Sequence, residues 1–137
     1  MTKEKTLTFA IMDPPFESAR SVTAFRLMAE AIRAGFGVNV FAYEGAVYLP
    51  FARQQQHANA VHGRDVAQEN HPLTKDWIAA LMREARAKGV KFDWVNCGLC
   101  VDERGAGEAI DGVRRGSPAD LWKMAVESHN TIVIGTR

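Results

Sequence analysis

Stretches with strand character alternate with amphipathic stretches along this chain, and this alternation is the feature that most restricts its fold. Four segments have strand character: residues 7–12, 38–43, 90–96 and 131–134. Two segments repeat apolar side chains three or four positions apart, as amphipathic helices do: residues 17–34 and 73–88. Strands that alternate with helices need crossover connections. The pattern therefore predicts a three-layer α/β domain with a mainly parallel sheet.

Local signals place the ends of the predicted helices. Gly35 and Gly89 follow the two amphipathic stretches directly and are suited to end them. Ser117 and Pro118 combine a hydroxyl N-cap with a proline at the first helical position, which predicts a third helix leading to the last strand. Three tryptophans lie at core spacing in their elements and are expected to pack inside: Trp77, Trp94 and Trp122.

The composition of the 137-residue chain predicts one soluble globular domain spanning residues 1–137. A domain of this size buries roughly two-thirds of its unfolded surface, so it needs neither disulfides nor a structural metal. The formal net charge is +1, which gives no basic field for nucleic-acid binding. The first apolar run is too short for a signal peptide or a membrane span, so we expect a cytoplasmic protein that does not contact membranes.

Residues 44–72 interrupt the alternation, and residues 51–72 are read as a polar excursion from the domain that either is mobile or packs on another subunit. His57 and His62 within it are expected to be solvated loop residues. The loop over residues 13–18 follows the first strand, where a phosphate-binding loop would lie, but it has no glycine and contains two acids. Nucleotide binding is therefore disfavoured.

Cys97 and Cys100, the two cysteines of the chain, form its most informative local motif. Cys97 directly follows the strand predicted over residues 90–96, and reacting groups in open α/β sheets gather beyond the carboxyl ends of strands. A thiolate at this place would benefit from close backbone approach at Gly98 and from the positive charge of Arg104.

Several interpretations compete for this pair. Thioredoxin-type exchange is disfavoured, because the motif comes late in the chain and glycines follow it. A zinc site needs about four ligands, and the histidines are scattered over positions 57, 62, 71 and 129. No metal or cofactor is therefore expected. The simplest alternative makes Cys97 a small buried residue and Cys100 an inert neighbour.

The motif Cys-Gly-x-Cys-x-x-x-Arg-Gly runs from Cys97 to Arg104 and Gly105. Together with the proline-containing loop after the first strand and residues 21–25, 41–48 and 112–134, it resembles the DsrE family of sulfur-relay proteins, which includes DsrE/DsrF and TusD-type subunits. The resemblance covers nearly the whole chain. Its spacing matches Cys97, rather than Cys100, to the sulfur-carrying cysteine of the family.

The resemblance implies a flavodoxin-like domain with a sheet of about five strands, assembled as a homotrimer or hexamer. It implies that Cys97 holds sulfane sulfur as a persulfide and passes it to a TusA-like acceptor protein after loading from a sulfur donor. Cys100 is a second catalytic candidate, which could resolve the persulfide, and Gly98, Arg104 and Gly105 are candidates for substrate binding. The sequence leaves open whether this relay is an enzymatic turnover.

Two other functions stay open from the sequence. The chain could be a non-catalytic, oligomeric interaction subunit that keeps the fold for assembly. It could also be a dithiol redox protein that forms a reversible disulfide between Cys97 and Cys100.

Overall fold

The structure, a computed structural model, describes residues 4–16, 18–58, 62–67 and 72–135. Within these residues, five strands form one sheet in the order β4-β3-β2-β1-β5, and all neighbouring strands are parallel. The strands are β1 (Thr6–Ile11), β2 (Gly37–Ala42), β3 (Phe92–Cys97), β4 (Val113–Gly116) and β5 (Asn130–Ile134). The helices are α1 (Arg20–Arg33), α2 (Thr74–Lys88), α3 (Gly98–Arg104), α4 (Pro118–Glu127) and the short 3-10 helix η1 (Glu44–Tyr48). The predicted α/β class with a parallel sheet is confirmed.

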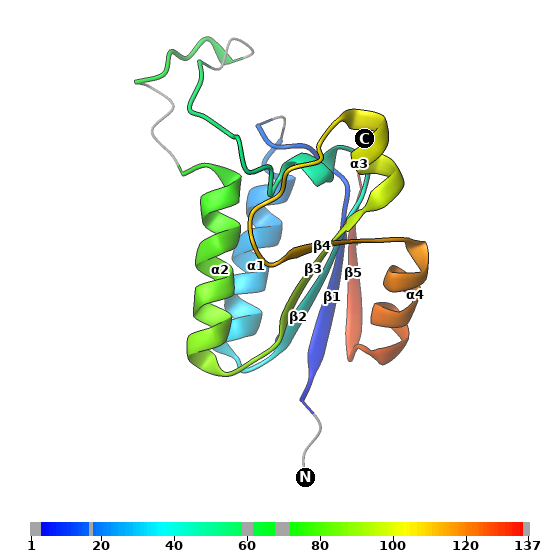
Figure 1. Ribbon diagram of the computed structural model, residues 1–137. Coiled ribbons are helices and arrows are strands. Elements are labelled where there is room, and N and C mark those ends of the chain that lie inside the picture. Colours follow the sequence, from blue (N-terminus) through cyan, green and yellow to red (C-terminus); the bar gives the residue numbers. More distant parts are fainter. Residues whose placement is uncertain (1–3, 17, 59–61, 68–71, 136–137) are drawn as a thin grey trace.

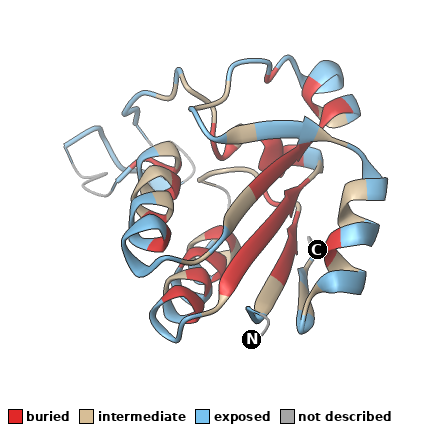
Figure 2. Ribbon diagram, turned by 60° about the horizontal axis from the view of Figure 1, so that its bottom comes forward, coloured by how far each residue is buried: buried red, intermediate tan, exposed pale blue. Residues whose placement is uncertain are grey.

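The helices divide unevenly between the two faces of the sheet. Helices α1 and α2 cover one face, α4 lies on the other, and α3 and η1 sit together beyond the carboxyl ends of the strands (Figure 1). The α1/α2 side holds a large core around Phe9, Phe25 and Trp94, whereas the α4 side holds a small cluster around Phe41 and Val95. Helix α4 keeps only Met124 buried, and Figure 2 shows its outer surface exposed.

The predicted helix ends are observed where the sequence signals placed them. Gly89 ends α2 in the left-handed conformation, at a φ of 75°, and Gly35 follows α1 at a φ of 87°. Ser117 and Asp120 form a capping box at the start of α4, with Pro118 at its first position. These positions are local in sequence, so short-range chemistry is enough to determine them.

Helix α1 begins at Arg20, later than the predicted start at residue 17, which lies outside the described residues. The preceding loop has its own hydrogen bonds. The Asp13 carboxylate accepts one from the Ser18 hydroxyl at 2.5 Å and pairs with Arg20 at 3.3 Å. Ser18 in turn accepts from the Arg20 N–H at 3.2 Å. These bonds hold the loop in a turn and delay the helix.

Two elements and one burial state differ from the sequence expectations. The glycine-rich stretch after Cys97 contains helix α3 and strand β4, neither of which was located in the sequence. Trp94 is fully buried and Trp77 packs against the same core, as predicted, but Trp122 is 73% exposed. The packing interpretation of Trp122 was wrong, because α4 packs on the sheet through Leu121 and Met124 and leaves Trp122 on its outer side.

The region after β2 is not a simple excursion. Residues 45–47 and Leu49 are buried, so η1 belongs to the core rather than to a polar loop. The following chain is anchored by Gln54, whose side-chain amide donates to Thr74 Oγ1 at 2.8 Å. His57 and His62 are exposed, in agreement with the loop interpretation, whereas His71 lies outside the described residues. No helix in the described part of the chain is long and apolar enough to cross a bilayer.

Candidate functional site

Cys97 is the last residue of β3 and at the same time the N-cap of α3, so the strand passes into the helix without a loop. Its side chain is 6% exposed and packs with Phe41, Val95 and Met124 on the α4 side of the sheet. On the neighbouring strand β4, Gly116 is its register partner. The structure therefore holds the thiol at the carboxyl end of an inner strand, in a small apolar cluster.

Cys100 lies one helical turn further on and faces the same cluster. Both cysteines are unbridged, and Cys100 is the more exposed of the two. Burial raises the pKa of the Cys100 thiol, and the nearby Cys97 side chain raises it further, while a hydrogen bond from the Glu44 N–H acts in the opposite direction. The net effect keeps Cys100 predominantly as a thiol near neutral pH.

Glu44 connects η1 to α3 through two groups. Its main-chain N–H donates to Cys100 Sγ at 3.1 Å. Its carboxylate pairs with Arg104 at 2.8 Å. Glu44 adopts a left-handed backbone with a φ of 52°, which is unusual for a residue with a side chain. This conformation is the one in which the structure presents the Glu44 amide to the sulfur.

Two further hydrogen bonds fix η1 beside the cysteines. The buried Asn96 side chain donates to Val47 O at 3.2 Å and accepts from the Trp94 indole at 2.9 Å. The Tyr48 hydroxyl donates to the main-chain oxygen of Arg104. Helix η1 is thereby attached to the end of β3 and to the last residue of α3.

The other residues of the motif, Gly98, Arg104 and Gly105, lie at the two ends of helix α3. Gly98 starts α3 with the Arg115 guanidinium packed against it, since an added Cβ would lie 3.1 Å from Arg115 Nη2. Gly105 ends α3 in the left-handed conformation, at a φ of 66°. Arg104, expected to face the thiol, instead pairs with Glu44. The structure thus brings Cys97, Gly98 and Cys100 together, but Arg104 and Gly105 lie at the far end of the helix.

Arg115 is a site residue that the sequence reasoning missed. It lies on β4, one position before the register partner of Cys97. It donates to Gly98 O at 3.0 Å and to Asp102 at 2.9 Å. Its guanidinium lowers the pKa of the Asp102 carboxyl. Asp102, which lies within the motif, therefore stays ionised, and Arg115 balances its negative charge.

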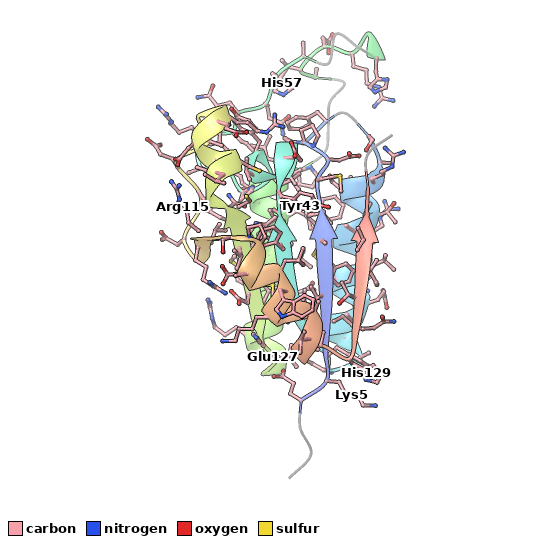
Figure 3. All side chains as sticks on the ribbon, turned by 90° about the vertical axis from the view of Figure 1, so that its right-hand side faces the viewer. Lys5, Tyr43, His57, Arg115, Glu127 and His129 are labelled. Atoms are coloured by element: carbon pink, nitrogen blue, oxygen red, sulfur yellow. The ribbon has the colours of Figure 1, made fainter. Side chains whose placement is uncertain are left out.

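Tyr43 is a second site residue that the sequence reasoning did not select. It follows Ala42, whose register partner is Asn96, so it is level with Cys97 on the next strand. Its ring lies 5.8 Å from that of Phe41, which shows that both side chains face the Cys97 cluster. Burial, and to a smaller extent the Glu44 carboxylate, raise the pKa of Tyr43, so its hydroxyl stays protonated. In Figure 3, Tyr43 and Arg115 lie toward one end of the sheet, opposite Lys5 and His129.

We compared the rest of the described structure with the cysteine pair as a candidate site. A hollow of about 290 Å³ lies between α1 and α2, lined among others by Arg26, Trp77 and Glu84, on the face of the sheet opposite Cys97. Among the described residues, no three His, Cys, Asp or Glu side chains gather as a metal site would require. The cysteine pair is therefore the site that the structure supports best.

A parallel α/β domain with an unbridged cysteine pair where an inner strand meets a helix is the class that this fold and site define. Within that class the family is clear, because the model of the DsrE/DsrF-like family matches residues 5–134. The chain belongs to this family, which is generally related to sulfur relay. The family resemblance seen in the sequence is confirmed.

Solved structures support the fold. The crystal structure of the YchN protein from E. coli superposes with a TM-score of 0.67 at 18% identity, covering 95% of this chain and 99% of that chain. BT1422 from Bacteroides thetaiotaomicron, a conserved protein of unknown function, gives a TM-score of 0.54 at 10% identity, covering 93% and 94% of the two chains. No curated protein sequence matches the chain.

Proposed function

We propose that the protein is a cytoplasmic sulfur carrier that holds sulfane sulfur as a persulfide on Cys97 and passes it to an acceptor protein thiol. The observation that carries this proposal is the unbridged Cys97–Cys100 pair at the end of β3, in a chain of the DsrE/DsrF-like family. A thiol at this place is held by a rigid strand rather than by a mobile loop. A position of this kind holds the sulfur in one geometry for each exchange.

Loading needs no cofactor. The Cys97 thiolate attacks the outer sulfur of a donor persulfide, a new sulfur–sulfur bond forms on Cys97, and the donor leaves as a thiolate. Delivery is the same exchange, with the thiolate of the acceptor as the attacking group. The apolar cluster around Cys97 shields the bound sulfur from water and from unrelated thiols.

The acceptor is proposed to be a small TusA-like carrier that approaches over α3. Leu99 stands between the two cysteines in sequence and is 72% exposed, so it offers an apolar contact beside them. The near-neutral net charge of +1 leaves local contacts of this kind to provide recognition.

We also propose that the chain assembles as a homotrimer or hexamer through its α4 side. Trp122 and Val126 are 73% and 65% exposed on α4, one turn apart. Val133 on the edge strand β5 is 64% exposed, and since Ile132 and Ile134 pack in the opposite core, it faces the α4 side as well. Parallel sheets are normally covered on both faces, so this apolar surface is suited to self-association.

Mass spectrometry after exposure to inorganic polysulfide tests the carrier function. The reduced wild-type protein is expected to gain sulfur atoms that a reductant removes, and Cys97→Ser is expected not to load. Equal loading of Cys97→Ser and wild type would show that Cys97 is not the carrier. If neither protein loads while the wild type remains a stable oligomer, the interaction-subunit function is favoured instead.

A further inference from the structure

The two thiols differ in how easily another protein can reach them. Cys97 is 6% exposed beneath Phe41, Val95 and Met124, whereas Cys100 reaches the partly exposed surface of α3. An acceptor thiolate must approach the outer sulfur in line with the bond that breaks. That approach is more open at Cys100 than at Cys97.

The two side chains are close enough for direct exchange. Cys97 is the N-cap of α3 and Cys100 is the third residue of the helix, so they meet across its first turn. They pack in the same apolar cluster, and the Cys97 side chain influences the Cys100 thiol directly. The helix therefore places a second sulfur beside the first without any movement of the backbone.

Glu44 supplies a feature that a merely structural cysteine does not need. Its N–H donates to Cys100 Sγ at 3.1 Å, and the amide is presented from a left-handed backbone with a φ of 52°. A main-chain N–H of this kind stabilises a sulfur that carries negative charge. Backbone outliers in non-glycine residues concentrate at sites where the strain is part of the mechanism.

Resting on the proposed function of Cys97, we propose that Cys100 takes the sulfane sulfur from Cys97 and presents it to the acceptor. The Cys100 thiol first transfers its proton to the outer sulfur of the Cys97 persulfide anion. The Cys100 thiolate then attacks that outer sulfur. The bond from Cys100 Sγ to the outer sulfur forms, the bond from Cys97 Sγ breaks, and its electron pair leaves on Cys97 as a thiolate.

This step is balanced without any further reactant. One negative charge and one proton are present before and after the exchange, and the sulfane sulfur keeps its oxidation state. The Glu44 N–H stabilises Cys100 when it becomes the thiolate. Attack on the inner sulfur would be a different reaction, which closes a Cys97–Cys100 disulfide and expels hydrogen sulfide.

The test compares wild type, Cys100→Ser and Cys97→Ser as full chains. Each protein is loaded with inorganic polysulfide, freed from excess, and mixed with glutathione as the acceptor. The amount of sulfur lost is followed by intact mass. The position of the sulfur is found by alkylation and fragmentation between Gly98 and Leu99, which separates the two cysteines.

Wild type that carries one sulfane sulfur per chain is expected to show it partly on Cys97 and partly on Cys100 before the acceptor is added, whereas Cys97→Ser is expected to show none on Cys100. Cys100→Ser is expected to accept one sulfane sulfur per chain as well, on Cys97 alone, and to release it to glutathione at about one tenth of the wild-type rate or more slowly. Release from Cys100→Ser at the wild-type rate overturns the inference. So does wild-type sulfur found on Cys97 alone, or loss of two hydrogens with release of sulfide. Equal loading of Cys97→Ser is the separate outcome that overturns the carrier function itself.

Discussion

Glu44 shows how a single residue couples backbone strain to the sulfur site. Its main chain reaches Cys100 and its side chain reaches Arg104, both more than fifty positions later in the sequence. Nothing local predicts either contact, since a glutamate after a strand is expected to be a solvated turn residue. The left-handed backbone of Glu44 is thus a property of the tertiary structure.

Replacing Glu44 by glycine or by alanine separates the strain from the ion pair. Both variants lose the carboxylate that pairs with Arg104 equally. Alanine keeps the cost of a left-handed backbone at a φ of 52°, whereas glycine adopts it freely. We expect Glu44→Gly to be more stable than Glu44→Ala by about 1 kcal/mol.

Urea unfolding of the two variants side by side measures this difference. Wild type serves as the reference for the ion pair, which contributes at most about 1 kcal/mol at an exposed position. An alanine variant as stable as the glycine variant would show that the residue does not keep its left-handed conformation in solution.

At the scale of elements, the sequence predicted the helices and strands that have a regular apolar pattern and missed the short ones that have none. Helices α1 and α2 and strands β1 to β3 have long apolar patterns, and they were located from the sequence to within a few residues. Helix α3 was missed, because its seven residues are too few for a pattern and its N-cap is a cysteine without a side-chain cap. Strand β4, Val-Arg-Arg-Gly, was missed because an edge strand with two arginines has no apolar alternation.

The residues of the candidate site also divide into those that a local sequence pattern predicts and those that only the tertiary structure brings together. The position of Cys97 at a strand end was predictable, because β3 has a clear pattern that ends there. Tyr43 and Arg115 reach the site only through parallel register with β3, which joins residues far apart in the chain. Arg104 was expected at the thiol by proximity in sequence, but the direction of α3 carries it toward Glu44 instead.

Gly116 is the point at which β4 meets α4, and it has no room for a side chain. An added Cβ would overlap Asp120 of the capping box and Val95 of β3. We expect Gly116→Ala to destabilise the protein by about 1–3 kcal/mol, because either the cap opens or the strand shifts. Thermal unfolding monitored by circular dichroism measures the loss.

Gly107→Ala is the matched control for this substitution. Gly107 has no atom within 4 Å of an added Cβ and no positive φ. Its replacement is expected to change stability by less than about 0.5 kcal/mol. Equal effects of the two substitutions would contradict the steric explanation at Gly116.

At the scale of the whole molecule, the unequal covering of the sheet has consequences for assembly. If the α4 side is the contact between copies, replacing Trp122 and Val126 together by glutamine removes the apolar area that associates. Sedimentation velocity is expected to show an oligomer for wild type and a monomer near 15.1 kDa for the double variant.

Leu27→Gln provides the control for this prediction. Leu27 is 43% exposed on α1, on the opposite side of the sheet, so the oligomer is expected to persist. An α4 double variant with wild-type mass, or a wild type that is already monomeric, would contradict assembly through α4.

Because β1 and β5 pair in parallel, the chain enters the sheet at the amino ends of the strands and leaves it at their carboxyl ends. Register runs from Ile134 through Ile11 and Ala42 to Asn96, so the end of β5 is level with the cysteine, three strands away or roughly 14 Å. The start of β1 lies at the opposite end of the sheet, as Figure 1 shows. An affinity tag or fused domain placed after β5 therefore crowds the face that partners must approach, whereas one placed before β1 leaves it open.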